Sequence, residues 1–240
     1  MIIELLVMNF TENYYSNHTP IYSARRYVTI INWIKLMQKD NFSIIDIGCG
    51  DGRCLELINK KTAISDLTGL EESVEYLKIA KKKHSSKFLK GNVLTLKSDR
   101  KYDVVIMSAL LHHLIGKNRK NSRELSDIAI KNSLSILKRG GSLIIMEPVF
   151  SNVRLMDLLF YIKKILSTYF NRRISLFGYW NNIGAPVVSY FSKESLSAMI
   201  TQSGESITKS KYIPAKSNTL YRLLGVKRGD LYLLIQKGRT

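Results

Sequence analysis

The feature that most constrains this chain is a glycine-rich segment, residues 44–53 (IIDIGCGDGR), set between a short apolar run and a helical pattern. The apolar run predicts a buried strand over 43–47 that carries Asp46 near its end, and a helix is expected over 53–60. Three glycines in the turn permit a tight reversal and close approach of a ligand to the backbone: Gly48, Gly50 and Gly52. The pattern therefore predicts a ligand site where this strand passes into its helix.

The alternation of strand and helix patterns continues along the chain. Further strands are predicted over 66–70, 87–89, 102–107, 142–146, 206–213 and 230–235. Helices are predicted over 73–83 and 122–137, and Gly140-Gly141 predicts a turn before 142–146. Continuous apolar strands separated by helices are typical of a parallel sheet covered on both faces. The predicted fold is a doubly wound, Rossmann-like α/β sheet of seven strands, mostly parallel with an antiparallel edge strand.

A chain of 240 residues suits one domain, which we divide into four parts. Residues 1–42 form an N-terminal helical cap, with Ala24, Tyr27, Ile30, Ile31 and Ile34 on one helix face. Residues 43–148 form a ligand-binding core. Residues 149–191 interrupt the rhythm as an inserted helical lid, and residues 192–240 add a C-terminal helix and two strands.

A second acidic residue, Glu71, ends the next predicted strand about 20 residues after the glycines. A carboxylate at this position can accept hydrogen bonds from the hydroxyls of a ribose. Arg53 stands where a dinucleotide fingerprint would have its third glycine, which favours a nucleoside ligand. The alternative is that Glu71 is a surface acid that caps the next helix, a role that Glu72 or Ser73 could also supply.

These residues resemble the class I S-adenosylmethionine-dependent methyltransferases of the small-molecule type. The similarity continues through 71–80 (EESVEYLKIA), 91–93 (GNV), 102–108 (YDVVIMS), 111–114 (LHHL), 137–143 (LKRGGSL) and 191–194 (FSKE). It covers residues 43–148 well and 190–240 loosely. Asn92 stands where the family usually has Asp, and its amide oxygen can still accept from an adenine amino group. Arg139 replaces the family's usual proline.

The resemblance implies S-adenosyl-L-methionine as cofactor and a role for each matching residue. Asp46 would order the glycine loop and approach the amino acid part of the cofactor. Gly48 and Gly50 would let the backbone lie against its methionine and ribose parts, with Cys49 between them as a packing residue rather than a nucleophile. Contacts with the ribose and adenine would come from a second group of residues: Glu71, Glu72, Asn92 and Val93. Ser108, at the end of the fourth strand, would border the sulfonium.

Methyl transfer is an in-line displacement, so positioning is the main contribution of the enzyme, worth about 7–11 kcal/mol of barrier. A base is needed only where the acceptor must lose a proton. His112 and His113 follow the fourth strand, although each could instead pack or cap. We predict His113 as the base, with Glu147 as second choice. No carboxylate pair at ligand spacing is found near the site, so metal-independent transfer is expected.

The insertion contains one broad apolar face at helical spacing, made of Leu155, Leu158, Leu159, Ile162, Ile165, Leu166 and Tyr169. Phe160 and Tyr161 flank this face, and Lys163 and Lys164 are expected away from its centre. The helix could pack on the edge of the sheet, cover a hydrophobic acceptor pocket, or lie on a membrane surface. Residues 177–182 (FGYWNN) and the tyrosines Tyr14, Tyr15 and Tyr22 are candidate walls of the pocket.

The net charge of +18, from 37 Lys+Arg against 19 Asp+Glu, favours acidic partners. The basic stretches are not interleaved with aromatic residues, which favours a solvated surface over a nucleic-acid footprint. The expected partner is a small-molecule or lipid-like acceptor, with peripheral contact to an anionic membrane. Two alternatives stay open: an RNA methyltransferase, and a non-catalytic S-adenosylmethionine-binding protein. SALL at 108–111, rather than an N-P-P-[YF] tetrapeptide, argues against the former.

Location is predicted from what the sequence lacks. The first residues carry no basic stretch followed by a small-residue cleavage site, and no apolar run reaches membrane-spanning length. The only cysteines, Cys49 and Cys54, are too few for a disulfide framework. A cytoplasmic protein is therefore expected, and its oligomeric state is left open.

Overall fold

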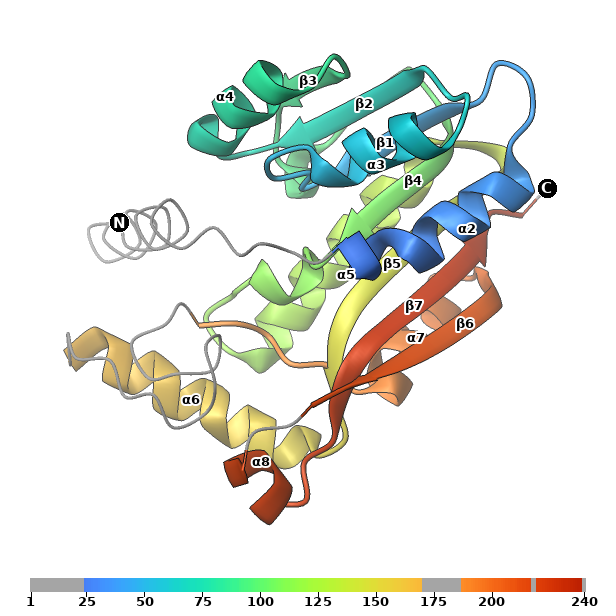
Figure 1. Cartoon of the computed structure of the whole chain (residues 1–240). Helices are drawn as coiled ribbons and strands as arrows, with labels where there is room; N and C mark the ends of the chain where they lie inside the picture. Colours follow the sequence, from blue (N-terminus) through green and yellow to red (C-terminus); the bar gives the residue numbers. More distant parts are fainter. Residues whose placement is uncertain (1–23, 170–186, 217–218, 239–240) are drawn as a thin grey trace.

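The computed structural model describes residues 24–169, 187–216 and 219–238, which form a twisted sheet between helices (Figure 1). The sheet has seven strands in the order β3-β2-β1-β4-β5-β7-β6. Their bounds are β1 Ser43–Ile47, β2 Asp66–Glu71, β3 Lys87–Lys90, β4 Tyr102–Ser108, β5 Leu137–Phe150, β6 Ser206–Ala215 and β7 Arg228–Gln236. Strands β1 to β5 pair in parallel, whereas β7 runs antiparallel to both β5 and β6. The predicted architecture is confirmed, with the antiparallel strand one place in from the edge.

Helices cover both faces of this sheet because successive strand residues point to opposite sides. On one face α2 (Val28–Met37), α3 (Arg53–Lys61) and α4 (Val74–Lys83) pack in a cluster that includes Ile44. On the other, α5 (Arg119–Ser135) and α7 (Lys193–Gln202) pack in a cluster that includes Ile45. The strand order reverses between β1 and β4, and ligands of open α/β sheets bind at the carboxyl ends of the strands at such a point.

The predicted turn at Gly140-Gly141 is wrong, because β5 runs continuously through both glycines. Tyr102 of β4 pairs with Leu137, and the next pairing joins Val104 to Ser142. Residues 138–141 therefore bulge opposite Asp103. Gly140 adopts a φ of 71°, a conformation that glycine supplies without steric cost.

The N-terminal segment lies against the same face as α3. Tyr27, Ile30, Ile31 and Ile34 are buried as predicted, but Ala24 is exposed, because it lies in a 3-10 turn (Ala24–Tyr27) that precedes α2. An ion pair joins this turn to the far end of the chain, with Arg26 Nη2 3.2 Å from Asp230 Oδ1. The hydroxyl of Tyr232 also donates to the carbonyl of Arg26 at 2.8 Å.

The helix α6 (Val153–Tyr169) follows β5 and extends beyond its carboxyl end, with α8 (Thr219–Leu223) near its start (Figure 1). A third apolar cluster packs the end of β5, α6, the segment 187–191 and the region of α8 against one another. Its members are Phe150, Met156, Leu159, Phe160, Val188, Tyr190, Tyr221 and Val226. None of the helices in the three described ranges combines the length and the apolar character needed to cross a membrane.

The predicted apolar face of α6 is only partly correct. Leu155 and Leu159 pack inward as predicted, but Leu158, Ile162 and Ile165 are 56%, 38% and 58% exposed. The inward face also carries Phe160 and the fully buried Lys163. The predicted apolar residues spread over a wide arc, so periodicity alone does not select the inward direction. Polar contacts with the neighbouring helix select it instead.

Arg119, at the start of α5, makes the main contacts of this kind. Its Nε donates to Asp157 of α6 at 2.6 Å, and its other nitrogens donate to the Ser189 hydroxyl and the Tyr190 carbonyl. Lys164 donates to the Gly116 carbonyl at 2.9 Å. These contacts hold α6 and the segment 187–191 against the body of the protein.

Candidate functional site

The glycine loop after β1 has the backbone conformation that its sequence predicts. Gly48, Gly50 and Gly52 have φ angles of 70°, 53° and 81°, in the region that disfavours other residues. The N–H groups of Gly48 and Cys49 both donate to the Leu70 carbonyl, at 2.8 and 3.1 Å. These donors are therefore engaged within the fold. A Cβ added to Gly50 would meet nothing within 4 Å, so the loop leaves open space at this position.

Asp46 lies beneath this loop and is almost fully buried. Burial, and then the charge of Glu71, raise the pKa of Asp46 to about 8. Its Oδ1 has no hydrogen-bond partner among the described residues. A buried polar atom without a partner is uncommon and calls for an explanation such as an absent ligand. The resemblance implies that the amino acid part of S-adenosylmethionine lies here, and this role of Asp46 stays a prediction.

Glu71 connects the glycine loop with the start of α4. Its Oε2 accepts from the Gly50 N–H at 2.8 Å, and its Oε1 accepts from the N–H groups of Glu72 and Ser73, each at 2.9 Å. Burial raises the pKa of Glu71 despite these bonds. A carboxylate offers about four acceptor positions, so roughly one remains for a ligand hydroxyl. The capping alternative is therefore present in the geometry, and the ribose role stays a prediction.

The residues expected to face adenine lie together beside Glu71. Asn92 donates from Nδ2 to Glu72 Oε1 at 2.8 Å and accepts the Leu94 N–H on its Oδ1 at 2.7 Å. An amide oxygen has two lone pairs, so one remains for an adenine amino group. Val93 turns its side chain into the core and its carbonyl accepts from Asn132 at 2.8 Å.

Cys49 points away from the loop opening. A Cβ on Gly69 would lie 2.7 Å from its sulfur, which shows that the thiol packs against β2. Burial raises the pKa of Cys49 well above its usual range. The thiol therefore stays protonated and packs, as expected, and contact with a cofactor at this position is left to the backbone.

Sequence reasoning missed the two residues after Ser108, which itself ends β4 at the expected place. Ala109 has a φ of 57°, rare for a residue with a Cβ, and its N–H donates to the Met146 carbonyl at 2.7 Å. This bend directs Leu110 at the glycine loop, where its Cδ1 would lie 2.8 Å from a Cβ on Gly48. No signal in the sequence marks Ala109 for this conformation.

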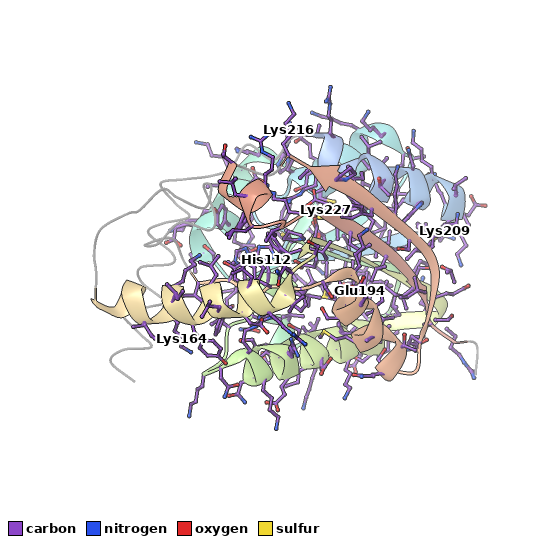
Figure 2. All side chains as sticks on the ribbon, turned by 90° about the horizontal axis from the view of Figure 1, so that it is seen from below. His112, Lys164, Glu194, Lys209, Lys216 and Lys227 are labelled. Carbon is purple, nitrogen blue, oxygen red and sulfur yellow. The ribbon has the colours of Figure 1, made fainter. Side chains whose placement is uncertain are left out.

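The two histidines and Glu147 form a compact cluster at the carboxyl ends of β4 and β5. His112 Nδ1 lies 2.7 Å from Glu147 Oε2, and Glu147 Oε1 accepts the Leu111 N–H at 2.6 Å. The rings of His112 and His113 are 4.0 Å apart between centroids. Figure 2 places His112 in the middle of the molecule, whereas Lys209 and Lys216 lie near its outline.

Burial shifts the ionisation of all three groups. The pKa of Glu147 is raised to about 7, and that of His112 is lowered to about 3 by burial and by the charge of Arg26. Burial also holds the pKa of His113 well below its usual range. The prediction that His113 is the base stays a prediction. His112 contacts the Glu147 carboxylate directly, and the charge of Glu147 also acts on His113, where it opposes the lowering of the pKa by burial.

Some predicted residues lie outside the described part of the chain: Tyr14, Tyr15, Tyr22 and residues 177–182. Within the described ranges, no group of three or more His, Cys, Asp or Glu side chains is placed to hold a metal ion.

Comparisons with known proteins bear on this site as a whole. A family model described as "Methyltransferase domain" matches residues 22–209. No curated protein matches the sequence.

Several solved structures share the fold. Magnesium protoporphyrin IX methyltransferase (ChlM) from Synechocystis PCC 6803 with bound SAH is 16% identical, with a TM-score of 0.57 over 89% of this chain and 83% of that chain. A SAM-dependent methyltransferase from Methanosarcina mazei is 19% identical, with a TM-score of 0.62 over 87% and 98%. N-methyltransferase NodS from Bradyrhizobium japonicum WM9 in complex with S-adenosyl-l-homocysteine is 13% identical, with a TM-score of 0.57 over 89% and 86%.

Proposed function

This chain belongs to the methyltransferase domain family and is an S-adenosylmethionine-dependent methyltransferase, and from that premise we propose that it methylates a small, partly apolar acceptor. The observation that carries this proposal is the apolar cover beyond the carboxyl end of β5. There α6 and residues 187–191 contribute Met156, Leu159, Phe160 and Tyr190 to one cluster. Ser189 of this cover donates its N–H to the His112 carbonyl at 2.7 Å, so the cover adjoins the histidine pair.

The residues of the glycine loop and of β2 would hold the cofactor. Asp46 has a free buried oxygen, Gly50 leaves open space, and Glu71 retains an acceptor position for a ribose hydroxyl. Glu72, Asn92 and the backbone of Val93 would line the adenine side, and Ser108 the side of the methyl group. S-adenosylmethionine supplies a methyl group on a positively charged sulfur, which leaves as a neutral thioether.

On the acceptor side, residues of this chain would have to position the acceptor and remove a proton from it. The apolar cover excludes water and holds the acceptor in line with the transferring group, the contribution that accounts for most of the rate. An acceptor hydroxyl or amine must also lose a proton, and we assign this step to the pair His112 and His113 in the 3-10 turn Leu111–His113.

We extend the proposal to a lipid-like acceptor met at an anionic membrane surface. Its support is the outward face of α6, where Leu158, Ile162 and Ile165 are exposed and Arg154 precedes Leu158 by one turn. Exposed apolar side chains beside basic ones suit the boundary between lipid headgroups and acyl chains. The net charge of +18 adds attraction to anionic lipid.

The test is a transfer assay with tritium-labelled methyl donor on fractionated small-molecule, lipid and RNA extracts. Gly50→Val protein, which should not hold the cofactor, is the matched control. We expect label in an apolar small-molecule or lipid fraction with the wild type alone. Label confined to RNA would support the RNA methyltransferase alternative, and cofactor binding without transfer to any fraction would support the non-catalytic one.

A further inference from the structure

We propose that His112, rather than His113, takes the proton from the acceptor, and that Glu147 is the positioning residue that keeps the outer ring nitrogen of His112 free to do so. The inference rests on the proposed function and goes beyond it by assigning the proton and the residue that controls it. It is carried by a contact between two elements, the 3-10 turn after β4 and the end of β5.

The geometry separates the two histidines. His112 Nδ1 is 2.7 Å from Glu147 Oε2, so a single proton lies between these two atoms when the ring is neutral. The second oxygen of Glu147 accepts the Leu111 N–H at 2.6 Å, and the Ser189 N–H donates to the His112 carbonyl. Side chain and backbone of His112 are thus both fixed, which leaves Nε2 as its reactive atom.

The charge of Glu147 decides the tautomer of His112. An ionised Glu147 accepts a hydrogen bond from the Nδ1–H of His112, which leaves a lone pair on Nε2 of the ring. A protonated Glu147 donates its own proton to Nδ1, which moves the ring proton to Nε2 and abolishes the base. A buried carboxyl group that titrates near neutral pH therefore acts as a switch on its neighbour.

The proton step balances within the pair. The O–H or N–H bond of the acceptor breaks, its electron pair stays on the acceptor atom, and the proton bonds to Nε2 of His112. The proton on Nδ1 then passes to Glu147, so that the buried ring stays neutral. Water at the 13% exposed side chain of His112 returns the pair to its starting state by taking one proton away.

Three charged or titratable groups face Glu147 and His112 and set this balance. His113 lies beside His112. Arg26 lowers the pKa of His112 and that of Glu147, whereas Asp230 raises the pKa of His112. Burial dominates, raising the pKa of Glu147 to about 7 and lowering that of His112 to about 3. The pair therefore gains one proton as the pH falls through about 7, and transfer should weaken there.

Nuclear magnetic resonance tests the switch in the cofactor-free protein. With ¹⁵N-labelled histidine, the four histidines give few signals, and the loss of one set in His112→Asn assigns His112. We expect its proton on Nδ1 at pH 8.5 and on Nε2 at pH 5.5. In Glu147→Gln this exchange should vanish, because an amide does not titrate. A ring that keeps one tautomer throughout, or that becomes doubly protonated near pH 6.5, would overturn the proposal.

Kinetics provide the second measurement, with labelled methyl transfer to the best acceptor of a panel of phenols and primary amines. We expect kcat to fall by about 10²–10⁴-fold in His112→Asn, the usual contribution of a base, and by less than tenfold in His113→Asn. The acid limb near pH 7 should disappear in Glu147→Gln, while the Kd for S-adenosylmethionine stays within twofold. The opposite order of the two histidines would reject the assignment.

The outcomes separate this inference from the function on which it rests. Cofactor binding and transfer with an unchanged pH profile in Glu147→Gln would leave the function standing and remove the switch. Failure to bind S-adenosylmethionine would remove the function, whereas the tautomer measurement would still decide the contact. Should Glu147→Gln not fold, the wild-type spectra at the two pH values decide alone.

Discussion

The carboxylate of Glu71 links the glycine loop to the start of α4, because it accepts the Gly50 N–H as well as the N–H groups of Glu72 and Ser73. Its loss should therefore loosen the loop in addition to removing a contact with the cofactor. We expect Glu71→Ala to weaken S-adenosylmethionine binding by at least about 1.5–3 kcal/mol, roughly 10- to 150-fold. Calorimetry on the folded variant gives this number.

Two other variants serve as controls for this measurement of S-adenosylmethionine binding. Gly50→Val should bind least, because its side chain would fill the open space and strain a φ of 53°. Glu75→Ala, an exposed acid in the same first turn of α4, should bind like the wild type. Equal binding by Glu71→Ala and Glu75→Ala would show that Glu71 does no more than cap the helix.

Asp46 combines a cost in stability with a role in binding. Its folded pKa, about 8, lies above the ordinary value of 3.8, so between these pH values the folded state holds a proton that the unfolded state has released. Stability therefore falls as the pH rises towards 8. We expect Asp46→Asn to raise the Tm of the cofactor-free protein more at pH 9 than at pH 5, and to weaken cofactor binding. A Tm difference that does not change with pH would contradict the shift.

At the scale of single residues, the sequence predicted which residues form the glycine-loop site better than it predicted which side chains contact one another. Gly48, Gly50, Asp46 and Glu71 come together as expected, because strand ends and turns follow from local patterns. The contact between His112 and Glu147 joins residues 35 positions apart and depends on how β4 and β5 align. Periodicity carries no information on that alignment.

The helix α6 presents exposed apolar side chains, and their removal tests the proposed contact with lipid. We expect Leu158→Ser, Ile162→Ser and Ile165→Ser together to reduce sedimentation with vesicles of phosphatidylglycerol and phosphatidylcholine, because apolar area no longer enters the boundary. The Tm should fall little, since these side chains are exposed. The reference variant is Leu159→Ser, which should lose about 2–5 kcal/mol of stability as a buried truncation does.

Vesicle binding that survives the triple substitution would show that this face does not meet lipid. A large loss of Tm in the triple variant would show that the side chains are covered in solution.

Element bounds followed closely from the sequence wherever a strand was a continuous apolar run. They failed where tertiary contacts decide. The pair Glu147-Pro148 could have ended β5, yet the strand continues to Phe150. Beyond Met146 it no longer pairs with β4, so the missing N–H of Pro148 is tolerated on that side. The direction of α6 failed for a similar reason, because Arg119 sets it from another helix.

At the scale of the whole molecule, exposed lysines lie on different elements, such as Lys78 of α4 and Lys209 of β6. Figure 2 shows Lys164, Lys209 and Lys216 at separate places on the structure. We expect binding to anionic vesicles to be lost in 0.5 M NaCl, where screening is strong. RNA binding should be weak, lost at the same salt concentration and unaffected by the α6 substitutions. A footprint that persists at 0.5 M salt would indicate a dedicated nucleic-acid surface.

The place of β7 sets an order of events during synthesis. This strand is made after the six other strands of the sheet, yet it lies inside the sheet, between β5 and β6, and carries the Asp230 that pairs with Arg26. Until it arrives, the edge of β5 that carries Glu147 has no neighbour on that side, and β6 has nothing to pair with. A nascent chain can pair β1 to β5 early, but the side of the sheet that carries β6 forms only when β7 is inserted. Any arrest of translation before Arg228 therefore leaves β5 with an open edge at Glu147.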